Sequence, residues 1–225
     1  MIEISERLKK VYPGAVVGVL AMQGAKNPAR HGELENIGAA VETRLRNTFA
    51  AGGKPALKAH PVIAAYERYY KAFKKSYHVT LQLDSVIWKG RGVPSVSAVV
   101  KAMFIAELSN MLLTAGHDLE KVRLPLRLDV GGGTEMYAAL GEEQRIVKEG
   151  DMFISDAAGV ISSVIGGPDQ RTSISADTKD LLFTVYAPPG IGEPIVRRHL
   201  EDIQRYVTTI APDAATHCAE TLVAE

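Results

Sequence analysis

The sequence predicts an α+β fold in which helices occupy mainly the first half of the chain and a mixed or antiparallel sheet occupies the second. Two observations lead to this prediction. Apolar residues recur at helical spacings of three and four through most of residues 33–114, and strand-like apolar runs follow from residue 124 onward. Elements that are segregated in this way, without a regular strand–helix alternation, are typical of the α+β class.

Two amphipathic helices are expected in the first third of the chain. Residues 33–49 carry apolar side chains on one face, and the Gly52–Gly53 pair ends that helix. His60 and Pro61 open the second helix, because proline is favoured in the first turn. Its apolar stripe runs to Phe73, so its aromatic residues are expected in the core.

Two further helices are expected in different surroundings. Residues 96–114 are apolar nearly all round, which predicts a buried central helix that ends at Gly116 as a left-handed cap. Residues 193–210 are apolar on one side and charged on the other. That pattern predicts a surface helix with His199 among its polar groups.

Strands are predicted where β-branched and aromatic residues alternate with polar ones or form short apolar runs. These segments are residues 15–22, 124–130, 152–155, 160–165 and 181–187. One segment is ambiguous, because Val79, Leu81 and Leu83 alternate like a strand whereas Leu83, Val86 and Ile87 are spaced like a helix.

Length and composition predict one compact domain over residues 1–225. The chain is 46% hydrophobic and 23% charged, and a domain of this order of length buries roughly 70% of the surface of its unfolded chain. The apolar run nearest to a membrane span, residues 96–116, contains Lys101, Glu107 and Asn110. The first residues do not resemble a secretory signal. We therefore expect a soluble, cytoplasmic protein that does not enter a membrane.

Metal and cofactor sites are not expected from the sequence. The single cysteine, Cys218, can form neither an intramolecular disulfide nor a cysteine-based zinc site, and the six histidines do not have the spacing of metal ligands. The motifs GxxxxGK(S/T), GxSxG and HExxH are absent. His117 follows the predicted end of the buried helix and is expected in an exposed loop, where functional residues are common.

A run of three glycines allows two interpretations. Gly131, Gly132 and Gly133 directly follow a predicted strand, but no clear helix comes after them. They form either a tight turn that needs positive φ or a nest of backbone N–H groups open to a ligand.

The charged residues are balanced overall and unbalanced locally. The chain has 26 basic and 26 acidic residues, so its formal net charge is zero. From Lys71 to Lys101, however, the sequence contains six basic residues and one acidic residue, Asp84, and six minus one gives a local charge of +5. This stretch is either a solvated face or a phosphate-binding surface. The residues that would contact the phosphates of a tRNA are Lys74, Lys75, Lys89 and Arg91.

Several segments resemble one family in their order and spacing. Residues 166–183 read as a glycine-rich turn, a polar loop with an acidic–Thr pair and an apolar strand, and residues 151–160 read as the strand and hairpin before it. Residues 60–66, Phe73 and residues 89–94 resemble the helical first half of free-standing members. Together they resemble the B3/B4 domain of the phenylalanyl-tRNA synthetase β-subunit.

The resemblance covers residues 60–210, with residues 1–55 as a strand-plus-helix extension, and implies that residues 85–89 are helical. It also implies trans-editing, the hydrolysis of the ester in a mischarged aminoacyl-tRNA. Such an ester is already activated, so a positioned water and donors to the oxyanion suffice without a nucleophilic side chain. The partners would be tRNA, or aminoacyl-tRNA, and an amino acid.

This chain departs from the family pattern at positions where relatives carry polar residues. Pro168 stands directly after the Gly166–Gly167 pair, and Ser97, Ala98 and Lys101 stand at the start of the buried helix. These departures support an alternative, a non-catalytic module that binds an amino acid, a nucleotide or tRNA.

The resemblance brings several loops together and so nominates site residues. The catalytic candidates are His117, Glu135 and Asp169. The candidates for substrate binding are Gly131, Gly132, Gly133, Thr134, Gly166, Gly167, Arg171 and Thr172. Two of these residues also have a structural interpretation, Glu135 as a surface carboxylate and Arg171 as the partner of Asp169 in an ion pair that fastens its loop.

Overall fold

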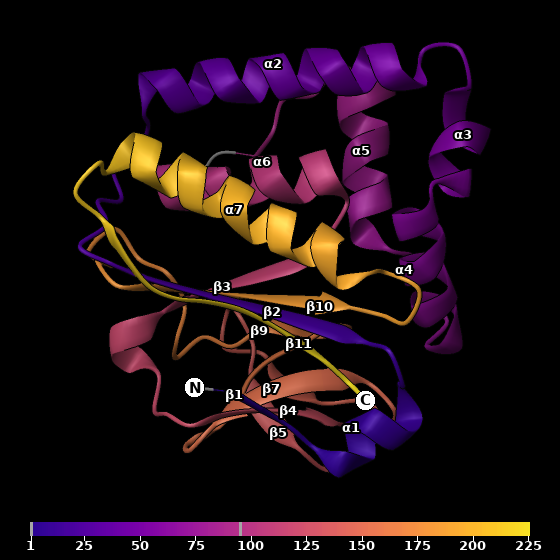
Figure 1. Ribbon diagram of the computed structural model, residues 1–225, viewed down its shortest axis with the longest axis vertical. Helices are drawn as coiled ribbons and strands as arrows, with labels where there is room; N and C mark the ends of the chain where they lie inside the picture. The colour runs from indigo at the N-terminus through magenta and orange to yellow at the C-terminus, as the bar shows by residue number, and fades with distance from the viewer. Residues whose placement is uncertain (1, 95) are drawn as a thin grey trace.

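The computed structural model of the protein describes residues 2–94 and 96–225, and its elements lie in layers (Figure 1). A four-stranded sheet lies in the middle, with α6 (Ala98–Asn110) and α7 (Glu193–Ile210) on one face and a five-stranded sheet on the other. Helix α2 (Gly32–Phe49) crosses above α6 and α7. The remaining helices of the first half flank these layers: α3 (Gly53–Ala59), α4 (Pro61–Ala72) and α5 (His78–Trp88). The prediction of an α+β fold is confirmed.

The four-stranded sheet is antiparallel and has the order β11–β2–β10–β3. Its strands are β2 (Val16–Gln23), β3 (Thr114–Asp118), β10 (Leu181–Ala187) and β11 (Ala215–Val223). Strand β10 is buried along its whole length because helices cover one face of the sheet and the second sheet covers the other. On the helical face, Val196 and Leu200 of α7 lie directly over Gly18 of β2. Strand β2 lies between two partners, so the first 55 residues contribute an inner strand of the sheet.

The five-stranded sheet has the order β1–β4–β7–β8–β9. Its strands are β1 (Ile2–Ile4), β4 (Leu126–Val130), β7 (Met152–Asp156), β8 (Gly159–Ser163) and β9 (Gly167–Pro168). Strand β1 runs parallel to β4 and the other neighbours are antiparallel, so the sheet is mixed. Helix α1 (Glu6–Val11), the short helix η1 (Leu119–Lys121) and the hairpin of β5 (Met136–Ala138) and β6 (Gln144–Ile146) complete the described fold.

The predicted helices and strands are found at their expected places, with three corrections. The ambiguous segment is helix α5, whose Val79, Leu83 and Val86 are buried. The central helix α6 ends at Asn110 and is capped by Met111, which has φ 61°, and not by Gly116, which already lies in β3. Finally, His199 of α7 is fully buried instead of facing solvent.

The described residues contain neither a membrane-spanning helix nor a cluster of metal-binding side chains. In the ranges 2–94 and 96–225, no helix has both the length and the apolar character needed to cross a membrane. Over the same ranges, His, Cys, Asp and Glu side chains do not gather in threes or more in a way that would hold a metal ion.

Candidate functional site

A pocket of about 580 Å³ opens between α6, β3 and the turn that joins β8 to β9. Its walls are mostly apolar and include Val100, Met103 and Phe104 of α6. Gly166 and Gly167, two of the predicted substrate-binding residues, form part of the opposite wall. The volume lies within the range of small-molecule sites, which is roughly 300–1,000 Å³. Val96 and Leu140 line it and are 76% and 52% exposed, so they mark an apolar mouth.

The Gly166–Gly167 turn needs both glycines. A Cβ at Gly166 would collide with the hydroxyl of Tyr137, and Gly167 has φ 79°. The amide of Gly166 donates to Ser163 Oγ at 2.9 Å, and Arg145 donates to the Gly166 carbonyl. These bonds hold the turn in place as a fixed wall of the pocket.

Glu107 is an acidic residue on an otherwise apolar wall. It lies in the last turn of α6, is 2% exposed and lines the pocket. One carboxyl oxygen accepts the amide N–H of Thr114 at 3.1 Å. Burial raises the pKa of Glu107 to about 8, and the Thr114 amide offsets part of that rise. The carboxyl is therefore mainly protonated at neutral pH while the pocket is empty.

His78, the first residue of α5, also lines the pocket, and its neighbours fix its tautomer. The hydroxyl of Tyr70 donates its one proton to the Val164 carbonyl at 2.9 Å, so His78 Nδ1, at 3.3 Å from that hydroxyl, must be the donor between the two. Burial lowers the pKa of His78 below its usual value. The neutral ring thus keeps its Nε2 lone pair free to accept a hydrogen bond.

A chain of buried hydrogen bonds runs from the pocket to three predicted residues. Tyr186 of β10 lines the pocket and its hydroxyl bonds to Ser162 Oγ, which lies 3.5 Å from His117 Nε2. His117 Nδ1 lies 2.7 Å from the Thr172 hydroxyl. That hydroxyl in turn donates to Asp169.

The proton positions along this chain of hydrogen bonds follow from the donor at its end, the hydroxyl of Thr172. Because the proton of Thr172 Oγ1 is directed to Asp169, His117 Nδ1 carries a proton and Nε2 accepts from Ser162. Tyr186 then donates to Ser162 and accepts from the Thr184 hydroxyl at 3.4 Å, so it can offer a ligand only its remaining lone pair. Burial lowers the pKa of His117 to about 3, so its ring stays neutral.

The position expected for His117 is wrong. The residue lies within β3 and is completely buried, because β3 is covered on both faces. It is therefore not in an exposed loop, and it does not line the pocket. The structure nevertheless places His117 in one hydrogen-bond network with Thr172 and Asp169, whereas Glu135, the other catalytic candidate, lies outside this network.

Arg171 fastens the loop that carries this network. Its guanidinium donates to both carboxylate oxygens of Asp156 at 2.9 Å and to the Lys121 carbonyl at 2.8 Å. Asp169 lies 3.7 Å from Arg171 Nε. The ion-pair interpretation of Arg171 therefore agrees with the geometry, although its main partner is Asp156 and not Asp169.

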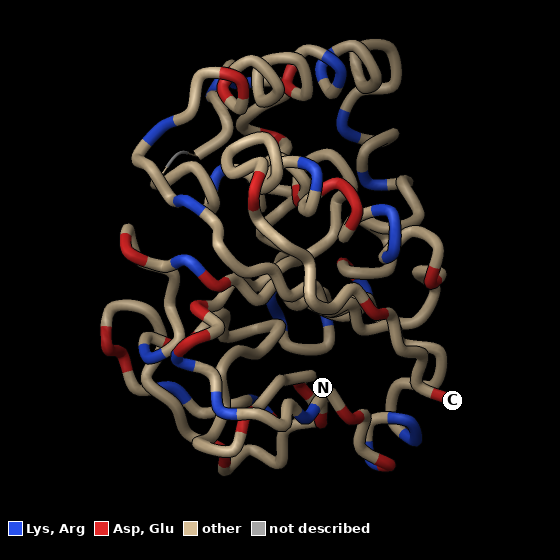
Figure 2. The backbone as a smooth tube through the Cα atoms, turned by 60° about the vertical axis from the view of Figure 1, so that its left-hand side comes forward, with Lys and Arg blue, Asp and Glu red and all other residues tan. Residues whose placement is uncertain are grey.

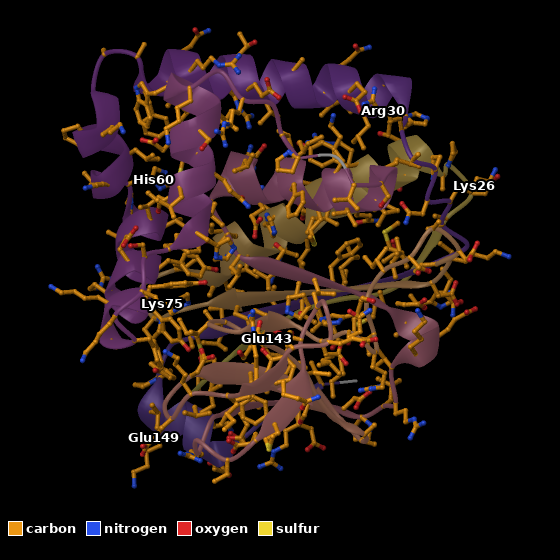
Figure 3. The ribbon with its side chains drawn as sticks, turned by 180° about the vertical axis from the view of Figure 1, so that it is seen from behind. Lys26, Arg30, His60, Lys75, Glu143 and Glu149 are labelled. Carbon is orange, nitrogen blue, oxygen red and sulfur yellow. The ribbon has the colours of Figure 1, made fainter. Side chains whose placement is uncertain are left out.

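The three-glycine segment forms a self-contained turn. The carboxylate of Glu135 accepts the amide N–H groups of Gly132, at 2.9 and 3.0 Å, and of Thr134, at 3.2 Å. A Cβ at Gly131 would collide with the backbone of residue 148, and Gly133 has φ 83°. The turn interpretation thus accounts for this segment, because its own glutamate occupies the N–H groups that a ligand would need. Gly133 packs beside Glu149, which Figure 3 places near α1, far from α2.

The predicted phosphate-binding residues lie in two pairs, one before and one after α5. Lys74 and Lys75, called here the leading pair, precede α5, whereas Lys89 and Arg91, the trailing pair, follow it. The eleven residues of α5 separate the two pairs by roughly 15 Å. Figure 3 places Lys75 away from α2, and basic and acidic residues are intermixed along the chain in Figure 2.

The two pairs also differ in their surroundings. The trailing pair follows the end of α5 that packs against α2, where Arg46 donates to the carbonyl of Val86 at 3.1 Å. Lys89 already contacts Asp84 at 2.9 Å. The leading pair is close in sequence to His78, which lines the pocket.

Glu107, Tyr186 and His78 are pocket residues that the sequence interpretation did not select. The sequence contains a signal for Glu107, because it is one of few charged residues in an almost wholly apolar helix. The structure adds that its carboxyl is buried and has a raised pKa, which is typical of functional sites. Tyr186 and His78 have no comparable signal, because tyrosine in a strand and histidine at a helix start are common in cores.

Comparison with known proteins gives a weak likeness of fold. No protein-family model matches the sequence, and no curated protein matches it either. Among solved structures, an N-terminal fragment of the phenylalanyl-tRNA synthetase β-subunit from Pyrococcus horikoshii is similar over 97% of this chain, with a TM-score of 0.48 and 13% identity. The chain spans about half of that fragment, 54% of its length. The likeness is a weak similarity of fold.

Proposed function

We propose that the pocket binds the aminoacyl group of an aminoacyl-tRNA and that the protein hydrolyses the ester of mischarged forms in trans. One observation carries this proposal: the pocket encloses about 580 Å³ between apolar walls and offers hydrogen-bond acceptors at Glu107, Tyr186 and His78. An apolar amino-acid side chain suits the walls, and a donor group suits the acceptors.

The charges of the lining favour an ester over a free amino acid. Lys and Arg are absent from the described residues that line the pocket. A free amino acid would bury its carboxylate without a cation to pair with it, at considerable cost. An aminoacyl ester has no carboxylate and keeps its ammonium group, so it avoids this cost.

Hydrolysis in such a site needs positioning more than reactive side chains. The oxygen of a water attacks the ester carbonyl, the electron pair of that carbonyl moves onto its oxygen, and the bond to the ribose oxygen then breaks. The proton of the water passes to the departing ribose oxygen, directly or through the vicinal hydroxyl. The products are the free amino acid and the tRNA 3′ end. Holding the water and the ester together supplies a large part of the rate.

Within this proposal the predicted residues take different parts. Gly166 and Gly167 form the substrate wall. His117, Thr172 and Asp169 act as positioning residues, because they direct the hydroxyl proton of Tyr186 to Ser162 and leave one lone pair for a bound water.

The remaining predicted residues have structural contacts. Arg171 holds the loop of residues 169–173 through Asp156. The turn of residues 131–135 is closed by Glu135. A part for these residues in substrate binding stays a prediction.

A second candidate function is a module that binds the same group without cleaving it. The observation that favours it is the absence of an ionised base: Glu107 is the single carboxyl among the described lining residues, and burial raises its pKa to about 8. Such a module would bind aminoacyl analogues and leave the ester intact.

The test is a deacylation assay with a panel of tRNAs that carry non-cognate amino acids. Gly116→Ala is the informative variant, because its new methyl group would enter the pocket 2.8 Å from Ile174 Cδ1 and 3.1 Å from Met103 Sδ, both ends of flexible side chains. Gly32→Ala, where nothing lies within 4 Å, is the matched control. We expect cleavage by the parent and by Gly32→Ala and slower cleavage by Gly116→Ala. If no ester is cleaved faster than in buffer, hydrolysis is refuted.

A further inference from the structure

We infer that Glu107 binds a primary ammonium group of the ligand through its carboxylate. The inference rests on the proposed function, because it specifies which part of an aminoacyl group the pocket recognises. The group is either the α-ammonium or a side-chain ammonium, and the two sources are separated by the experiment below.

The position of Glu107 is unusual for a purely structural carboxyl. It is buried on a pocket wall whose other α6 residues are apolar, and its one hydrogen bond comes from the neutral amide of Thr114. Among the described residues, no Lys, Arg or His forms an ion pair with Glu107. Lys101, on the same helix, pairs with Glu35 instead. Buried carboxyls are normally paired or satisfied by several hydrogen bonds. An ammonium in the pocket would provide the missing partner.

The ionisable groups around Glu107 do not provide a second anion that would bind the ammonium group. Burial raises the pKa of Tyr66, Tyr70 and Tyr77, in α4 and in the segment before α5, and the negative charge of Glu107 adds to the rise. Burial likewise raises the pKa of Tyr186 across the pocket. These four phenols are therefore neutral near pH 7.

The two histidines near Glu107 are neutral as well. Burial lowers the pKa of His78, on the pocket wall, and lowers that of His199, which contacts the Thr114 hydroxyl at 2.7 Å, to about 4. The described surroundings of Glu107 thus contain no cation that would repel an incoming ammonium.

Ammonium binding at this carboxyl is linked to protons. In the empty pocket the carboxyl is protonated below a pKa of about 8, whereas the bound ion pair needs the carboxylate. An α-ammonium loses its own proton above a pKa of about 7.7. The affinity for an α-amine, plotted against pH, should therefore follow a bell-shaped curve with a maximum near pH 8. It should rise roughly eightfold from pH 6 to pH 7.

The experiment is calorimetric titration of the intact protein with four amides at pH 6, 7 and 8. Leucinamide carries only an α-ammonium, Nα-acetyl-lysinamide carries only a side-chain ammonium, and lysinamide carries both. Nα-acetyl-leucinamide carries neither. Glu107→Gln removes the charge while its side-chain oxygen can still accept from Thr114. Glu201→Gln is the same substitution at an exposed position of α7 outside the pocket.

We expect at least one ammonium-bearing amide to bind tenfold or more tightly than Nα-acetyl-leucinamide, and the tighter amide identifies the source. Glu107→Gln should lose that preference and the pH dependence, and Glu201→Gln should keep both. Equal binding of all four amides by the parent overturns the inference without using any variant, so it stays testable even if Glu107→Gln does not fold. An unchanged preference in a folded Glu107→Gln also overturns it.

Failure of this inference is distinguishable from failure of the proposed function. If the parent cleaves aminoacyl esters while Glu107→Gln binds every amide as the parent does, only the ammonium site is refuted. If no amide binds and no ester is cleaved, both are refuted.

Discussion

Replacing Glu107 by Gln should remove a large part of the pH dependence of stability. The pKa of this carboxyl rises from 4.5 in the unfolded chain to about 8 in the fold because burial disfavours the charged form. A group whose folded pKa is raised contributes stability that is present below the unfolded pKa and is lost as pH rises through the folded pKa. For Glu107 this loss falls between about pH 4.5 and pH 8.

The size of the effect follows from the two pKa values. At about 1.4 kcal/mol per pKa unit, keeping Glu107 in its buried place costs the fold about 1 kcal/mol at pH 5 and between 4 and 5 kcal/mol at pH 8.5. The difference of about 4 kcal/mol is a large share of a typical unfolding free energy of about 5–15 kcal/mol. Glutamine has nearly the same shape and does not ionise.

The assay is urea denaturation of the parent and Glu107→Gln between pH 5 and pH 8.5. The two proteins should have similar unfolding free energies at pH 5, and the variant should be more stable by about 4 kcal/mol at pH 8.5. Other groups also make the unfolding free energy depend on pH, such as Asp151, whose pKa burial raises to about 6. Their contribution is the same in both proteins and cancels in the difference between the two unfolding free energies. Glu201→Gln, at an exposed position of α7, should follow the parent over this range. A constant difference between the parent and Glu107→Gln would refute the reasoning.

Three further predictions concern the framework and the tRNA. Tyr66→Phe leaves a buried carbonyl and a buried amide without their hydroxyl partner. This change should lower the unfolding free energy by about 2–4 kcal/mol. Tyr77→Phe leaves one carbonyl without its partner and should lower the unfolding free energy by about half as much in the same denaturation assay. Arg171→Met breaks the bidentate bond to buried Asp156 and should cost about 2–3 kcal/mol; a loss below about 0.5 kcal/mol would contradict that bond. Changing the leading pair to alanine should reduce the slope of log affinity for tRNA against log salt by about 1.5, and the same change in the trailing pair should leave the slope unaltered.

Local patterns in the sequence were sufficient for elements whose burial follows a period. Helix α7 has one apolar side because that side covers the sheet, and its ends agree with the predicted residues 193–210. Strand β10 was found at residues 181–187 because every position along it is buried and all but Thr184 are apolar or aromatic. In both elements the local preference and the tertiary surroundings agree.

Other elements have no such pattern, because tertiary contacts decide them. Strand β3 reads Thr-Ala-Gly-His-Asp and is held by its pairing with β10. Strand β11 is an edge strand with mostly exposed polar residues, so it has no apolar alternation to detect. The helix α3 begins at Gly53, which by itself indicates a break and not a start.

The pocket was only partly predictable for the same reason. It is assembled from α6, β3, the β8–β9 turn and the start of α5, which are distant in the sequence. The Gly166–Gly167 turn was selected because two adjacent glycines have a local signature. The acceptors at Glu107 and Tyr186 face the same cavity only after the sheets have formed, and no spacing rule connects them.

The central claim, that this pocket binds an aminoacyl group, is tested most directly by NMR of the protein with ¹³C-labelled methionine methyl groups. Met103 lines the pocket, and Met22 is fully buried in β2 outside it. The two resonances can be assigned with Met103→Leu and Met22→Leu. Titration with leucinamide should shift the Met103 methyl resonance in a saturable manner and leave that of Met22 in place. A Met103 resonance that does not move at saturating amide for any of a panel of amino-acid amides would contradict the account.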